Sequence, residues 1–75
     1  MPNSAITLGK VIRNKRESLE LSQEHLAALS DLNRNYIGEV ERGEVSVSVA
    51  ALEKIANGLG MKLSELIALY ERETN

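Results

Sequence analysis

The 75-residue sequence contains no cysteine, phenylalanine or tryptophan, and it has one histidine and one proline. Without cysteine, neither a disulfide nor a thiolate metal site can form, and a single histidine makes no cluster of metal ligands. No apolar run approaches the ~18 residues that suggest a membrane span, and there is no secretory signal. We therefore expect a cytoplasmic protein with no membrane association, no metal, no cofactor and no small-molecule ligand.

Enzyme motifs are also missing. The sequence has no HExxH, GxxxxGKS or GxGxxG pattern. Ser22 and His25 are close together, but a hydrolytic triad needs a positioned acid and an oxyanion hole as well. We expect no catalytic residues and no enzyme activity.

The composition that remains is that of an ordinary globular domain. Hydrophobic residues make up 43% of the chain and charged residues 27%. A chain this short buries about 60% of its unfolded surface, which is enough for one aliphatic core. We expect a single domain over residues 1–75, without a second domain that senses a ligand.

Residues 22–43, SQEHLAALSDLNRNYIGEVERG, have the pattern of two short helices joined by a tight turn. Ser22 and Asn33 are good N-caps. Asp31 tolerates the left-handed backbone that the turn needs, and Gly43 is expected to end the second helix. The small Ala27 allows the two helices to approach closely. The pattern predicts a helix-turn-helix, whose inner side consists of Leu26, Leu29, Leu32, Ile37 and Val40.

Helical spacing of apolar residues predicts three further helices, one ending at about residue 19 and the others over residues 49–59 and 63–71. Val45, Val47 and Val49 alternate as in a strand, but the segment is short and has no partner strand, so we expect a loop. The fold class is therefore all-α, a compact five-helix domain. The inward positions of the three further helices are Leu8, Val11, Ile12, Leu19, Leu52, Ile55, Ala56, Leu59, Leu63, Leu66, Ile67 and Tyr70.

Three blocks in this order, LSQEHLA, NRNYIGEVERG and LEKIANGLG, resemble the lambda-repressor-like (Cro and xenobiotic-response-element) family of helix-turn-helix regulators. The resemblance runs from about residue 8 to residue 70. It implies a sequence-specific transcriptional regulator that binds a two-fold operator in double-stranded DNA as a homodimer. Controller proteins of restriction–modification systems resemble this chain in length and in the Arg-x-Tyr-Ile opening of the recognition helix. Phage repressors and antitoxins share the same blocks.

The second helix of the motif offers candidates for base contact. At about 100° per residue, its outer side holds Asn35, Gly38, Glu39 and Arg42, with Arg34 and Tyr36 in the first turn. Arginine can pair with guanine, asparagine with adenine, and glutamate with cytosine N4. We expect base contacts from Arg34, Asn35, Tyr36 and Glu39. The alternative is a solvated helix face, which we favour for Glu39. Gly38 either admits a DNA backbone or is merely tolerated.

The resemblance implies that Gln23 and Arg42 contact backbone phosphates. Ser46 and Ser48 could donate to phosphate as well, although Ser48 is equally suited to capping the next helix. The resemblance also pairs Arg16 with Glu41. Glu41 falls on the inner side of its helix, where an unpaired carboxylate would be costly.

The two-fold contact is expected on the helix over residues 63–71, through Met61, Leu66, Leu69 and Tyr70. Leu69 lies about 100° or more from most of the core stripe, so we expect it to face solvent.

The acidic net charge favours a function other than DNA binding. The net charge is −2, and residues 23–43 hold two arginines against four acidic side chains, so phosphate neutralisation should be modest. The alternative is therefore a protein-interaction module on the same fold, such as an antitoxin-type or regulatory adaptor. Salt-dependent binding to generic duplex DNA would separate the two functions.

Overall fold

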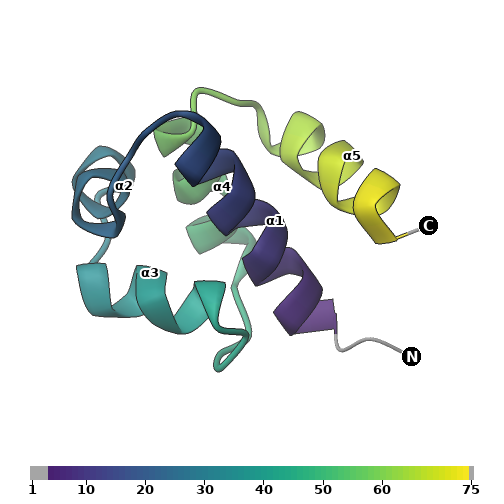
Figure 1. Ribbon diagram of the computed structural model, residues 1–75, viewed down its shortest axis with the longest axis horizontal. Coiled ribbons are helices and arrows are strands. Elements are labelled where there is room, and N and C mark those ends of the chain that lie inside the picture. The colour runs from purple at the N-terminus through teal and green to yellow at the C-terminus, as the bar shows by residue number, and fades with distance from the viewer. Residues whose placement is uncertain (1–3, 75) are drawn as a thin grey trace.

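The computed structural model describes residues 4–74, which form five helices and no strand. In Figure 1, α2 and α3 lie at one end, α5 lies at the other, and α1 and α4 run between them. The predicted all-α, five-helix architecture is confirmed. None of the helices in this part of the chain is long and apolar enough to cross a membrane. The bounds are α1 Ser4–Ser18, α2 Gln23–Ser30, α3 Arg34–Glu41, α4 Val49–Gly58 and α5 Leu63–Thr74.

The core is aliphatic and draws on all five helices. Two leucines that the sequence assigned to it are exposed instead. Leu19 is 42% exposed because it follows the last residue of α1, and Leu29 is 53% exposed because the covered face of α2 runs through Leu26, Ala27 and Ser30. The buried hydrophobic residues are Val11, Ile12, Leu26, Ala27, Ile37, Val40, Leu52, Ile55, Ala56, Leu59 and Leu66.

Side-chain caps fix where three helices begin. The Ser22 and Ser48 hydroxyls accept backbone N–H bonds of 3.0 and 3.1 Å in the first turns of α2 and α4, and Asn33 Oδ1 accepts one of 2.7 Å at α3. Asp31 has a left-handed backbone with φ 54° between α2 and α3. These four predictions are confirmed, and the turn at Asp31 with the cap at Asn33 sets the relative direction of α2 and α3.

Gly43 ends α3 in a Schellman motif. Its φ is 72°, and its N–H donates to the Val40 carbonyl at 3.0 Å, while the Glu44 N–H donates to the Glu39 carbonyl at 2.9 Å. These two crossed bonds satisfy carbonyls that a helix end otherwise leaves unpaired. The motif also fixes the direction in which the chain leaves α3.

Gly9 sets how closely α1 approaches α3. A Cβ atom at Gly9 would clash with the Val40 carbonyl oxygen and would lie 2.6 Å from the Glu41 carbonyl oxygen. Since both obstacles are backbone atoms, a larger residue could be accommodated only by moving one helix. Gly9 therefore positions the C-terminal half of α3, a role that no pattern in the sequence predicted.

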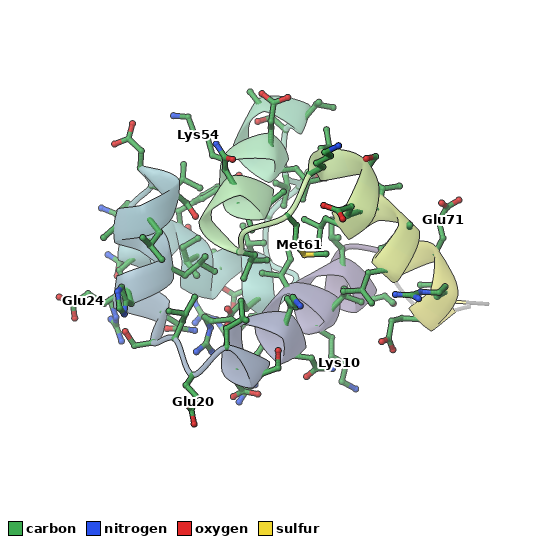
Figure 2. The ribbon with its side chains drawn as sticks, turned by 90° about the horizontal axis from the view of Figure 1, so that it is seen from above. Lys10, Glu20, Glu24, Lys54, Met61 and Glu71 are labelled. Carbon is green, nitrogen blue, oxygen red and sulfur yellow. The ribbon has the colours of Figure 1, made fainter. Side chains whose placement is uncertain are left out.

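The apolar residues of α5 differ from expectation. Leu69 does not face solvent: it is half-buried and packs against the core. Leu66 has 0% of its surface exposed, so it has no surface to offer a second subunit, and its assignment to a dimer contact is wrong. Met61 and Tyr70 are half-buried against the core, and Figure 2 shows Met61 near the start of α5.

Candidate nucleic-acid interface

An open pocket of about 330 Å³ lies between the start of α2 and the outer side of α3. We call it the α2–α3 groove. Five of the side chains that the sequence assigned to DNA contact are brought together here from two helices. The lining residues are Gln23, Arg34, Asn35, Gly38, Glu39 and Arg42.

Three other candidates lie outside the groove. Tyr36 is half-buried and packs against the core, because its direction on α3 is between the inner and outer sides. Ser48 uses its hydroxyl oxygen to cap α4, which leaves the hydroxyl hydrogen available for a phosphate. Ser46 is exposed in the loop that follows α3.

Arg16 and Glu41 form a buried pair directly behind the groove. Arg16 Nε and Nη2 donate to the two carboxylate oxygens of Glu41 at 2.7 and 3.1 Å, and Arg16 Nη1 donates to the Leu21 carbonyl at 2.6 Å. The two side chains are 10% and 2% exposed. The hydrogen bond to Glu41 raises the pKa of Arg16, against the opposing effect of burial. The predicted pair is confirmed, and it connects α1 to α3.

Gln23 is attached to the same pair. Its Nε2 donates to Glu41 Oε1 at 3.0 Å, so the carboxylate holds side chains from α1 and α2 at once. An amide nitrogen carries two hydrogens, and the second remains available for a phosphate. The sequence pointed to Gln23 by resemblance only. A buried carboxylate such as that of Glu41 accepts more hydrogen bonds than Arg16 alone supplies. This requirement could have predicted the bond from Gln23.

Arg42 and Glu44 form a second pair at the edge of the groove. Arg42 Nε and Nη2 donate to the two carboxylate oxygens of Glu44 at 3.0 and 3.1 Å, and the side chains are 57% and 53% exposed. The hydrogen bond with Arg42 lowers the pKa of Glu44, and the same bond raises the pKa of Arg42. No pattern in the sequence predicted this pair.

Gly38 lies beneath Arg42. A Cβ at Gly38 would be 2.9 Å from Arg42 Nη1, and Gly38 itself is buried. Of the two alternatives for Gly38, close approach of a DNA backbone or a merely tolerated glycine, neither included this contact: the space over Gly38 is occupied by the Arg42 guanidinium. Arg34, in contrast, has no ion-pair partner among residues 4–74, and its side chain is exposed at the start of α3.

Known proteins resemble this chain along most of its length. A family model described as helix-turn-helix matches residues 12–66. The control protein C.MunI of Mycoplasma sp. is 45% identical over 64 residues, 85% of this chain and 86% of that protein. The control protein C.BamHI of Bacillus amyloliquefaciens is 39% identical over 66 residues, covering 87% and 82%. The crystal structure of the restriction–modification controller protein C.AhdI from Aeromonas hydrophila is 42% identical, with a TM-score of 0.80 over 83% of this chain and 94% of that one.

Proposed function

Because this chain belongs to the Cro/C1-type helix-turn-helix family of DNA-binding transcriptional regulators, we propose that it is the controller of a restriction–modification system and binds a two-fold operator as a homodimer. The α2–α3 groove is the observation that carries the proposal. It brings arginine, asparagine and glutamate side chains on the outer side of α3 together with Gln23 of α2, and these are the residue types that read base edges and phosphates.

In this proposal α3 enters the major groove with its first turn against the bases. Arg34 and Asn35 are both exposed there, and they make the principal base contacts. Tyr36 and Glu39 contribute at the edges of the same surface. Gln23, Arg42, Ser46 and Ser48 hold the flanking phosphates and so fix the register of α3 on the duplex.

A homodimer would supply the second recognition helix. One helix in one major groove reads few base pairs, and two-fold operators match proteins that present two such helices about 34 Å apart. Helix α5 packs on α1 and α4 and lies away from α3, so a partner docked there would leave α3 accessible (Figure 1). With Leu66 fully buried, the proposed contact is narrowed to Met61, Leu69 and Tyr70.

Arg34→Ala tests whether the first turn of α3 contacts bases. An operator is first selected from a pool of random duplexes, and binding is then measured on that operator and on a scrambled duplex. We expect a loss of about 1–3 kcal/mol on the operator and a smaller loss on the scrambled sequence. Arg72→Ala, which removes the same charge from α5, is the control. Equal losses on both duplexes would assign Arg34 to phosphate. Absence of salt-dependent binding to any duplex would contradict the function and favour the protein-interaction module.

Leu69→Glu tests the dimer. Two like charges across the two-fold axis should shift sedimentation toward the monomer over a concentration series, while circular dichroism reports that the domain stays folded. Ala50→Glu, which adds a carboxylate to the exposed first turn of α4, is the matched control. A folded Leu69→Glu protein that dimerises as well as the wild type would place the interface elsewhere.

A further inference from the structure

The Arg42–Glu44 pair lies where the proposed function needs a free cation. We propose that Glu44 is an internal competitor of DNA phosphate: it holds Arg42 in the free protein, and each phosphate contact of Arg42 has to be made against it. The inference rests on the proposed function and adds to it a residue that sets how strongly the surface binds duplex DNA of any sequence.

The backbone fixes Glu44 beside Arg42. Gly43 has φ 72°, and the Glu44 N–H donates to the Glu39 carbonyl at 2.9 Å, so the residue that follows Gly43 turns back toward the end of α3. From this position the Glu44 carboxylate reaches Arg42 Nε and Nη2 together, at 3.0 and 3.1 Å. Such a two-bond fork is the arrangement in which arginine also binds a phosphate.

The same geometry limits what is left of the guanidinium. Arg42 Nη1 lies over Gly38, 2.9 Å from where a Cβ would be. One edge of the group is therefore occupied by a carboxylate, and another side faces the α3 backbone. A phosphate that approaches Arg42 must either displace Glu44 or bind close to a like charge.

Displacement is feasible because the pair is in contact with solvent. The Arg42 and Glu44 side chains are 57% and 53% exposed, and exposed pairs of this kind are weak. Exchange therefore leaves no charge stranded in the interior. The displaced Glu44 carboxylate stays beside the phosphate and keeps a salt cation near it, which offsets part of the cation release that Arg42 causes. Arg42 therefore adds less to the salt dependence of binding than an unpaired arginine would.

Arg34 provides the internal reference. It lines the same groove and has no ion-pair partner among the described residues. On a random-sequence duplex, where Arg34 has no cognate base to read and contacts phosphate instead, removal of Arg34 should reduce the salt slope by about one unit, and removal of Arg42 by clearly less. The two arginines differ in this respect because only one of them has a carboxylate beside it.

Glu44→Gln is the decisive variant. Binding of the full chain to a random-sequence 25-base-pair duplex is measured by fluorescence anisotropy from low to moderate salt. We expect roughly three- to fivefold tighter binding at low salt and a slope steeper by up to about one unit. Glu71→Gln removes the same formal charge from α5, at the end of the molecule opposite Glu24 of α2 in Figure 2, and should have a much smaller effect.

The Arg42→Gln background completes a double-mutant cycle. In the Arg42→Gln protein, Glu44→Gln should change the affinity for DNA no more than Glu71→Gln does, since Glu44 no longer has an arginine to pair with. Glu44→Ala, with circular dichroism as the folding control, removes any bond that the glutamine amide retains and should act in the same direction. Binding by Glu44→Gln that equals the Glu71→Gln control would overturn the inference while leaving the proposed function intact. Weaker binding would overturn it too, since it would mean that Glu44 orients Arg42. A wild-type chain that binds no duplex would refute both.

Discussion

Two arginine–glutamate pairs meet at the end of α3, one on its inner side and one on its outer side. Arg16–Glu41 and Arg42–Glu44 have the same fork, in which Nε and Nη2 donate to the two carboxylate oxygens at 2.7 and 3.1 Å and at 3.0 and 3.1 Å. Their surroundings differ. The inner side chains are 10% and 2% exposed, and the outer ones 57% and 53%.

The difference shows that burial, rather than bond geometry, decides what such a pair does. In the interior, loss of one partner leaves a charge that neither water nor protein solvates well. At the surface, water or a phosphate replaces either partner readily. The inner pair therefore fastens α1 to α3, and the outer pair is available for exchange with a ligand.

Arg16→Ala breaks the inner pair and should have the largest effect. It leaves Glu41 buried with Gln23 as its remaining donor, and we expect the free energy of unfolding to fall by roughly 3 kcal/mol. Urea denaturation measures this change. The double mutant Arg16→Ala/Glu41→Gln should recover part of the lost unfolding free energy. Strictly additive losses in the double-mutant cycle would mean that the two residues do not interact directly.

Gly9→Ala disrupts the packing of α1 against the inner side of α3 without removing a charge. The new Cβ would meet the Val40 and Glu41 carbonyl oxygens, which belong to the α3 backbone, so the helices must separate. We expect a loss of stability of about 1–3 kcal/mol, despite the better helix propensity of alanine. An unchanged or raised denaturation midpoint would show that α1 can shift without penalty.

Gly38→Ala is the matched substitution on the outer side of α3. It should raise the free energy of unfolding, whereas Gly9→Ala should lower it. The new Cβ meets the Arg42 side chain, which can move, so the fold should gain up to about 1 kcal/mol from helix propensity. A destabilised variant would argue that Arg42 is as fixed as the α3 backbone.

Glu44 titration should show the smallest effect. The bond with Arg42 lowers the pKa of Glu44, so the pair stabilises the fold above the unfolded pKa, and this stabilisation is lost as pH falls through the folded pKa. Carboxyl NMR shifts should give a midpoint below the ordinary glutamate value, returning toward it in Arg42→Gln. The pH dependence of the unfolding free energy should be nearly the same in the wild type and in Arg42→Gln, since Arg42 and Glu44 are both exposed. An identical midpoint in both proteins would mean that the pair does not persist in solution.

The sequence predicted well whatever depends on a few adjacent residues. Ser22, Asn33 and Ser48 were identified as caps because capping needs a short polar side chain just before a helix, and Asp31 because few residues accept a left-handed turn. The inner position of Glu41 followed from helical periodicity alone. Its pairing with Arg16 required the family resemblance.

Properties that depend on which helix covers which face were harder to predict. Periodicity gives the direction of Leu29 on α2 but not whether a neighbour lies there, and the same gap explains the errors at Leu66 and Leu69. Gly9 acts through backbone contact between α1 and α3, which leaves no sequence pattern beyond an isolated glycine in a helix. The fork of Glu44 on Arg42 depends on the chain direction set by the Schellman motif at Gly43.

The inner pair also has a topological consequence. Arg16 and Glu41 are 25 residues apart, and α2, the turn and nearly all of α3 lie inside the loop that they close. Opening the pair therefore loosens α3 from α1, whereas α2 stays packed on α4. Native-state hydrogen exchange should find the amides of α3 opening at a lower free energy than those of α2, so that the DNA-reading helix exchanges separately from the helix that precedes it.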